Sequence, residues 1–146
     1  MDFYFPSPMN LTFRPLTPSD LDSCLAILKE NYPTDFEYWK PFLLRDVSVE
    51  YFLVVLRGNV LVGFGAYIPL ENQPSIYRLV WINVPPKEQG GGIGKALVLE
   101  LENIIKLNHG ACRVILETDK PRFYEKIGYA SYHNNEKSAL MVKDLQ

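Results

Sequence analysis

The sequence predicts one α/β domain of the mixed α+β kind, built on a mostly antiparallel sheet with a parallel pair of strands at its centre. First, residues 51–56 and 60–67 are rich in branched and aromatic residues and flank a tight Gly-Asn turn, the pattern of a hairpin. Second, a strongly periodic helix over 93–108 lies between apolar strands at 76–84 and 113–117, and such a crossover makes two strands parallel. Third, 146 residues that are 47% hydrophobic suit a single core.

The first third of the chain is predicted to contain one strand and two helices. Residues 1–10 are expected to be irregular, and 11–16 alternate as a strand does. A helix over 17–31 begins with a capping hydroxyl, a proline and an acid. A second helix is expected over 35–46, where Pro41 must start, kink or break it.

The second half contains the clearest helix, over 93–108. Its apolar face consists of Ile93, Leu97, Leu101 and Ile105, and its polar complement is Glu100, Glu102, Asn103 and Lys106. Gly110 ends the helix. A short helix over 121–126 and strands at 129–133 and 139–142 complete the single domain, 1–146.

Composition excludes several classes of function. A formal charge of -2 gives no general attraction to nucleic acid or to an anionic membrane. No apolar run approaches the ~20 residues of a membrane span, and the N-terminus has no basic region typical of a secretory signal. Cys24 and Cys112 have no close pairing and are expected to be small buried hydrophobes in a reducing compartment. We therefore expect a cytoplasmic protein.

A glycine-rich turn between a strand and a helix is the strongest chemical signal. Its residues are Gln89, Gly90, Gly91, Gly92, Ile93, Gly94 and Lys95. Glycines let backbone N–H groups face a bulky anion, and the helix N-terminus adds its positive dipole end. Phosphate or pyrophosphate is the natural ligand, although such a cluster can also be only a flexible turn with helix-packing glycines.

Two phosphate-binding motifs fit this turn poorly. A Walker A loop needs a glycine where Gln89 stands and a hydroxyl where Ala96 stands. A dinucleotide fingerprint needs a small residue where Leu97 stands, and it belongs to a first βα unit rather than a late one.

The segment Gln89-x-x-Gly92-x-Gly94 resembles the acetyl-CoA loop of the GNAT acetyltransferases. Independently, residues 123–129, Phe-Tyr-Glu-Lys-Ile-Gly-Tyr, are similar to a second signature of that family. Two motifs at the family's separation are more specific than either alone. The resemblance implies a GNAT-type sheet whose parallel pair splays apart to admit the pantetheine arm of acetyl-CoA.

The resemblance also implies the roles of particular residues. The backbone of Ile82, Asn83 and Val84 would hydrogen-bond pantetheine, and the N–H groups of 89–95 would hold the pyrophosphate. A backbone N–H near Asn83 or Val84 would bind the developing oxyanion. Tyr124 would be the acid that protonates the departing thiolate.

The general base is not identified. Many relatives carry a strand glutamate near position 81 or 82, where this chain is apolar. Glu71, Glu117 and Asp119 are the candidates. His109 and His133 have no partners at metal-ligand spacing, so we expect no metal.

The acceptor is expected to be a small-molecule or peptide amine, acetylated by direct attack in a ternary complex. In this fold the first helices, the hairpin and the last strands surround that site, and these regions are aromatic here: Tyr32, Phe36, Tyr38, Trp39, Phe42, Tyr51, Tyr67, Tyr77 and Trp81. Most should lie in the core, and a few could line a pocket for an apolar or cationic amine. A non-catalytic acyl-CoA sensor and a nucleotide-binding regulatory domain remain alternatives, and exposed edge strands favour a homodimer.

Overall fold

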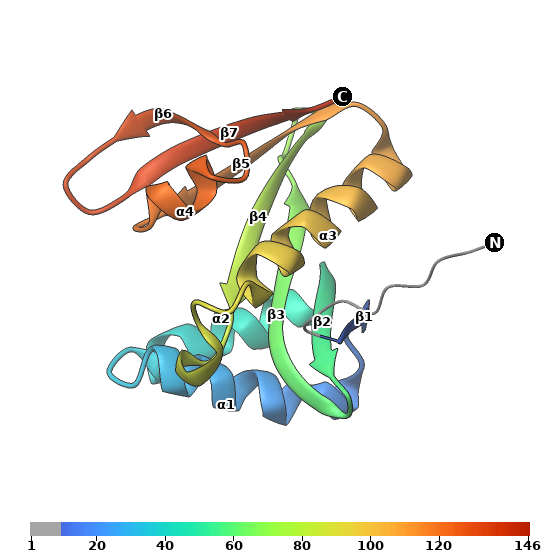
Figure 1. Cartoon of the computed structure of the whole chain (residues 1–146), viewed down its shortest axis with the longest axis vertical. Helices are drawn as coiled ribbons and strands as arrows, with labels where there is room; N and C mark the ends of the chain where they lie inside the picture. Colours follow the sequence, from blue (N-terminus) through green and yellow to red (C-terminus); the bar gives the residue numbers. More distant parts are fainter. Residues whose placement is uncertain (1–9) are drawn as a thin grey trace.

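The structure is a computed structural model that describes residues 10–146. Nearly all of the irregular segment expected over 1–10 lies outside these residues. Seven strands form one sheet in the order β1-β2-β3-β4-β5-β7-β6 (Figure 1). The strands are β1 Leu11–Pro15, β2 Tyr51–Arg57, β3 Val60–Pro69, β4 Ile76–Asn83, β5 Cys112–Thr118, β6 Ala130–Asn134 and β7 Ala139–Leu145. The α-helices are α1 Leu21–Asn31, α2 Phe36–Val47, α3 Ile93–His109 and α4 Pro121–Glu125, with single 3₁₀ turns at Pro18–Asp20 and Pro86–Glu88.

The pairing of the strands confirms the predicted fold class. β2 and β3 form the antiparallel hairpin, and β4 and β5 are the only parallel neighbours among the described strands. The crossover through α3 produces this parallel pair. β7 lies between β5 and β6, so the last two strands follow an order that the sequence pattern does not reveal.

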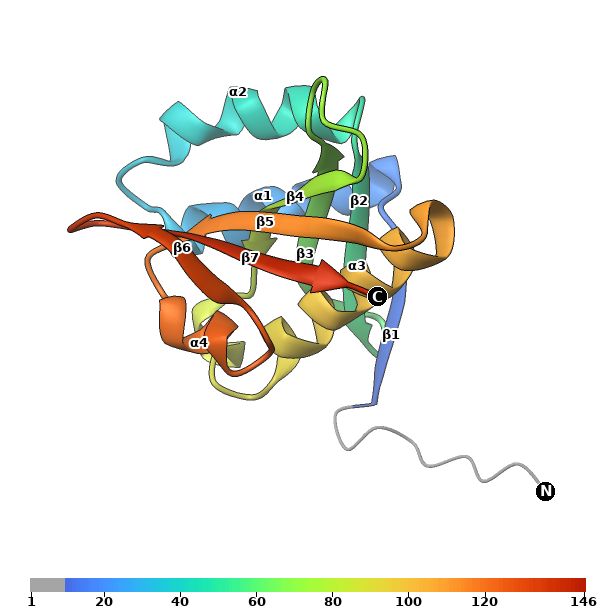
Figure 2. The same ribbon diagram turned by 90° about the horizontal axis from the view of Figure 1, so that it is seen from above.

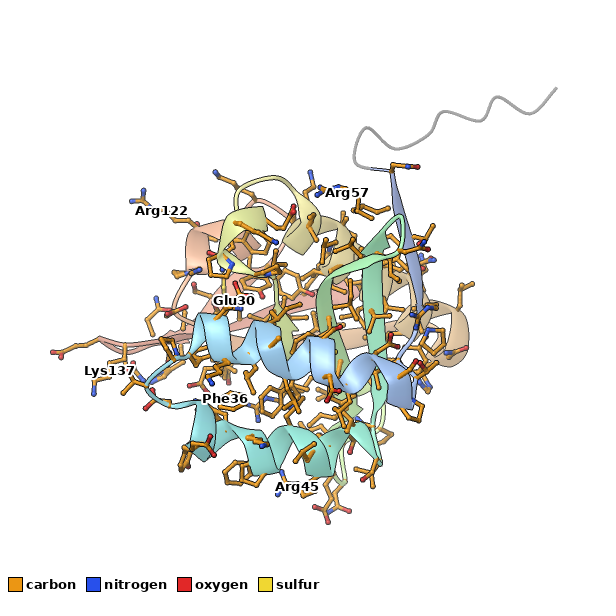
Figure 3. The ribbon with its side chains drawn as sticks, turned by 90° about the horizontal axis from the view of Figure 1, so that it is seen from below. Glu30, Phe36, Arg45, Arg57, Arg122 and Lys137 are labelled. Carbon is orange, nitrogen blue, oxygen red and sulfur yellow. The ribbon has the colours of Figure 1, made fainter. Side chains whose placement is uncertain are left out.

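Helices cover both faces of the sheet (Figure 2). α3 packs on one face through Ile93, Leu97, Leu101 and Ile105, each at most 1% exposed, which confirms the predicted apolar face. α1 and α2 lie side by side across the other face, where a second cluster forms around Cys24, Leu28, Leu43 and Phe64 (Figure 3). Both cysteines are buried and free, as expected.

Pro41 lies inside α2, so of the expected effects the structure excludes a start or a break at this residue. The proline removes the N–H that would bond the carbonyl of Glu37, and both residues are exposed, so water can serve that carbonyl. Glu102 belongs to the buried side of α3 rather than to its polar face. Its carboxylate accepts hydrogen bonds from the hydroxyl of Tyr129 at 2.8 Å and from Nζ of Lys143 at 2.7 Å, which compensate its burial.

Within residues 10–146, no helix combines the length and the hydrophobicity that a membrane span requires.

Candidate active site

The parallel strands β4 and β5 pair over only part of their length. Their last paired residues are Arg78 and Ile115. Beyond these, β4 continues to Asn83 beside β3, and β5 continues to Thr118 beside β7. In Figure 1 the two strands lie together near the C-terminus and diverge from there. Their facing edges therefore offer backbone groups to an extended ligand that contains amides.

β4 contains a bulge close to the point where the strands separate. Between its pairs with Ala66 and Phe64 of β3, it holds an extra residue. Trp81 lies in this stretch with a φ of 60°, a left-handed conformation that a bulky side chain rarely adopts. The indole Nε1 of Trp81 donates to Oδ2 of Asp46 on α2 at 2.8 Å. Such strain persists where the surroundings hold it and is concentrated at functional sites.

The glycine-rich turn connects the end of β4 to α3. Gly90 and Gly92 have φ values of 85° and 92°, which glycine adopts without steric cost. Gly92 is the N-cap residue of α3, and no side chain caps this end. The N–H groups of residues 90–95 have no acceptor among the described residues. Free N–H groups at a helix N-terminus suit an anion. Ile93 is buried and would contribute only its backbone, whereas Lys95 is exposed.

A polar bridge joins α1, β4 and the glycine-rich turn through the side chain of Asn31. Its Nδ2 donates to Oδ1 of Asn83 at 2.9 Å and to the carbonyl of Val84 at 3.1 Å. Its Oδ1 accepts from Nε2 of Gln89 at 3.3 Å, and that amide also donates to Val84 at 3.0 Å. The N–H of Gln89 bonds the carbonyl of Pro86. Gln89 thus holds the turn to the strand, and its own N–H is already used.

Asn31 is not recognisable as a site residue from the sequence alone. At the end of a helix and before Tyr-Pro, it is typical of a helix stop. Only its hydrogen bonds to Asn83, Val84 and Gln89 distinguish a site residue from a simple helix stop.

Tyr124 lies on α4 with its side chain 8% exposed. Its ring makes edge contacts with Phe123 and Tyr129. Its hydroxyl makes no hydrogen bond to any other residue in 10–146, yet it is not sealed from solvent. Burial raises the pKa of Tyr124 to about 12, with smaller contributions from Tyr32 and Asp119. The hydroxyl is therefore protonated at physiological pH and can donate a proton or hydrogen bond but cannot serve as a base.

The three candidate bases lie in different surroundings. Asp119 is close enough that its charge raises the pKa of Tyr124. Glu117 accepts a hydrogen bond from Ser138 at 3.1 Å, toward the β6–β7 turn. Glu71 lies in the β3–β4 turn, at the opposite end of β4 from its bulge. Of the three, Asp119 is the one whose charge affects the pKa of Tyr124.

The histidines serve other contacts. Nε2 of His109 lies 3.2 Å from the hydroxyl of Tyr67, and its ring stacks on Tyr77 at a centroid distance of 4.5 Å. His133 lies on the exposed strand β6. Within residues 10–146, no three His, Cys, Asp or Glu side chains are grouped to hold a metal ion.

Solved structures share this architecture. The chain is similar to the PaiA N-acetyltransferase from Thermoplasma acidophilum, solved in complex with coenzyme A, at 21% identity and a TM-score of 0.77 over 94% of this chain and 100% of that one. It is similar to aminoglycoside 6'-acetyltransferase type Ii at 21% identity and a TM-score of 0.79, over 91% and 96% of the two chains. It is also similar to the IAA acetyltransferase from Bacillus cereus at 15% identity and a TM-score of 0.72, over 92% and 99%. At these identities the likeness establishes the fold.

None of the curated proteins compared with the sequence matches it. The family model described as Acetyltransferase (GNAT) family matches residues 16–129, which include the β4 bulge, the glycine-rich turn and Tyr124. The chain therefore belongs to the GNAT family of acetyltransferase enzymes.

Proposed function

We propose that the protein transfers an acetyl group from acetyl-CoA to a primary amine by direct attack in a ternary complex. The observation that carries this proposal is the meeting of two unpaired strand edges with a turn of free N–H groups. An extended ligand with amides and a pyrophosphate matches both features at once. The coenzyme A bound in the structural relative from Thermoplasma acidophilum supports this choice of ligand.

In this proposal the N–H groups of Gly90 to Lys95 bind the pyrophosphate. Gln89 instead holds the turn in place through its side chain. Pantetheine pairs with the backbone of Ile82, Asn83 and Val84. The carbonyl of Val84 already accepts two hydrogen bonds. A backbone N–H near Asn83 or Val84 donates to the thioester oxygen as negative charge develops on it.

The chemical step requires a neutral amine. The amine arrives as an ammonium and loses one proton to water. Among the three candidate bases, Asp119 is the one proposed to assist this proton loss, because its charge affects Tyr124. The amine nitrogen then attacks the thioester carbon, the C–S bond breaks, and the thiolate accepts the proton of Tyr124. The second proton lost by the nitrogen returns the phenolate to its neutral form, so the products are an amide, free coenzyme A and one released proton.

The test is release of coenzyme A thiol across a panel of primary amines, together with calorimetric binding of acetyl-CoA. We expect binding without any amine and thiol release only when both substrates are present. Binding without release from any amine would favour a sensor instead. Tighter binding of ATP or NAD than of coenzyme A would contradict the proposed ligand.

A further inference from the structure

Four aromatic side chains form a partly exposed cluster on the α2 side of the sheet. They are Tyr38, Trp39 and Phe42 of α2 and Trp81 of β4. The ring of Trp39 makes edge contacts with Tyr38 at 4.9 Å and with Trp81 at 6.2 Å, measured between centroids. Phe42 lies 5.4 Å from Tyr38 and 6.2 Å from Trp39. Edge and tilted contacts of this kind hold a rigid apolar surface.

This aromatic cluster packs on the core under α1 and α2 through Trp81, but two of its rings face solvent. Tyr38 is 62% exposed and Trp39 is 38% exposed, although both are large enough to be buried. Arg45 lies over the ring of Phe42 at 5.2 Å, but no described cation lies over Tyr38 or Trp39. A rigid, solvent-facing set of aromatic rings is typical of a surface that binds something.

The cluster adjoins the position proposed for the thioester. Trp81 occupies the strained bulge of β4, and the next residue, Ile82, is the first of the three proposed to hold pantetheine. The side chain of Ile82 packs with the α3 core, whereas Trp81 packs with the α1 and α2 cluster. Ile82 and Trp81 therefore direct their side chains to opposite faces of the sheet, Ile82 toward α3 and Trp81 toward α2. The hydrogen bond from the indole to Asp46 fixes Trp81 in this position.

We propose that the amine acetylated by this enzyme carries an aromatic or flat apolar group, which packs on Trp39 and Trp81 while the amino group reaches the thioester. This inference rests on the proposed function and specifies its substrate class. Burying a phenyl group on these rings would contribute binding energy that a hydroxyl at the same position of the amine cannot supply.

The test compares 2-phenylethylamine with ethanolamine, which share an aminoethyl unit and differ in its substituent. We expect kcat/KM for 2-phenylethylamine to be at least about tenfold higher at saturating acetyl-CoA. In Trp39→Ala the ratio should fall toward one, with an unchanged KM for acetyl-CoA. Leu44→Ala is the matched control, because Leu44 lies on the same helix with the same 38% exposure and outside the aromatic cluster, so its ratio should stay at the wild-type value.

A second measurement does not depend on turnover. Trp39 and Trp81 are the only tryptophans in the chain, so intrinsic tryptophan fluorescence reports on this cluster alone. With coenzyme A bound, 2-phenylethylamine should change the emission saturably and ethanolamine should not. Equal kcat/KM values for the two amines, or a ratio unchanged in Trp39→Ala, would overturn the inference while leaving acetyl transfer intact. No turnover of either amine together with constant emission would also overturn the inference, whereas the proposed function fails only if no amine of the whole panel releases coenzyme A thiol.

Discussion

Tyr124 and Tyr129 lie in one short segment with ring centroids 5.6 Å apart, but their hydroxyls differ in partner. Tyr129 donates to the buried carboxylate of Glu102, which Lys143 also neutralises. Tyr124 has no protein acceptor among the described residues. The Tyr124 hydroxyl is open to solvent and available to a ligand, whereas that of Tyr129 is already used, so the structure separates a structural tyrosine from a candidate catalytic one.

The two tyrosines make a matched pair of variants. We expect Tyr124→Phe to lower kcat by about 10²-fold or more, since it removes the proposed acid, with little change in stability or in acetyl-CoA affinity. Tyr129→Phe should retain kcat and lose about 1–3 kcal/mol of unfolding free energy, because Glu102 loses a buried donor. Steady-state kinetics and urea unfolding measure both. Retention of full kcat in Tyr124→Phe would remove Tyr124 from the mechanism.

The pKa of Tyr124 sets an expected pH dependence. It is raised to about 12 in the folded protein, whereas an unfolded tyrosine titrates near 10. The contribution of this pKa difference to the unfolding free energy is fully present below about pH 10. It is lost as the pH rises through the pKa of Tyr124 in the folded protein. Tyr124 should therefore cause no alkaline fall in kcat between about pH 7 and 9.5. A fall in that interval that disappears in Tyr124→Phe would contradict this, as measured from pH–rate profiles.

Asn31 is expected to affect cofactor binding without contacting the reacting atoms. Asn31→Ala removes three hydrogen bonds that connect α1, β4 and the glycine-rich turn. The dissociation constant for acetyl-CoA should rise about tenfold in calorimetry. Glu30→Ala, at the exposed neighbouring position, is the control and should bind normally. Equal affinities of the two variants would show that the bridge does not position the turn.

At the scale of elements, the glycine-rich turn combines a conformational requirement with a binding one. Gly92 has a φ of 92°, so Gly92→Ala is strained, and the unfolding free energy should fall by about 1–2 kcal/mol. Gly91 has no such φ, and a Cβ there would make only an ordinary contact, so Gly91→Ala should change stability by less than about 0.5 kcal/mol. Urea unfolding compares the two. Equal losses of unfolding free energy in the two variants would indicate that the positive φ of Gly92 is not what disfavours a side chain at this position.

The sequence predicted those elements whose signal is local. The 3.6-residue period of α3 and the Gly-Asn turn between β2 and β3 are properties of neighbouring residues, and both were confirmed. The insertion of β7 between β5 and β6 is set by contacts between distant strands, which leave no periodic trace. Likewise, the burial of Glu102 depends on Lys143, 41 residues away, so the helical pattern alone assigned it to the polar face.

Part of the candidate site, likewise, could not be predicted from neighbouring residues in the sequence. The glycine-rich turn and Tyr124 lie in short motifs and could be named from the sequence. The bulge at Trp81 and the bridge through Asn31 could not, because each requires partners from another element. Short motifs identify the chemistry, whereas tertiary contacts determine how it is held.

At the scale of the whole molecule, the divergence of β4 and β5 separates the sheet into two parts. β1 to β4 carry α1 and α2, and β5 to β7 carry α4, while α3 connects the two (Figure 1). Beyond Arg78 and Ile115 no strand pairing joins these parts in the described residues. A ligand placed between the strands would contact both and should make them unfold as one.

Hydrogen exchange can measure this coupling directly. We expect coenzyme A to slow amide exchange in residues 79–84 and 90–95, where the proposed contacts lie, and to leave the edge strand β1 at 11–15 unchanged as an internal control. At about 100 times its dissociation constant it should add about 2.7 kcal/mol to the unfolding free energy, whereas NAD at the same concentration should add little. If the ligand bridges the two parts of the sheet, protection should also rise in residues 116–118 of β5. These residues already pair with β7 when no ligand is bound, so the rise would add to existing protection. Protection confined to the glycine-rich turn would mean that only the phosphates are bound, and the pantetheine arm would then have to lie outside the strands.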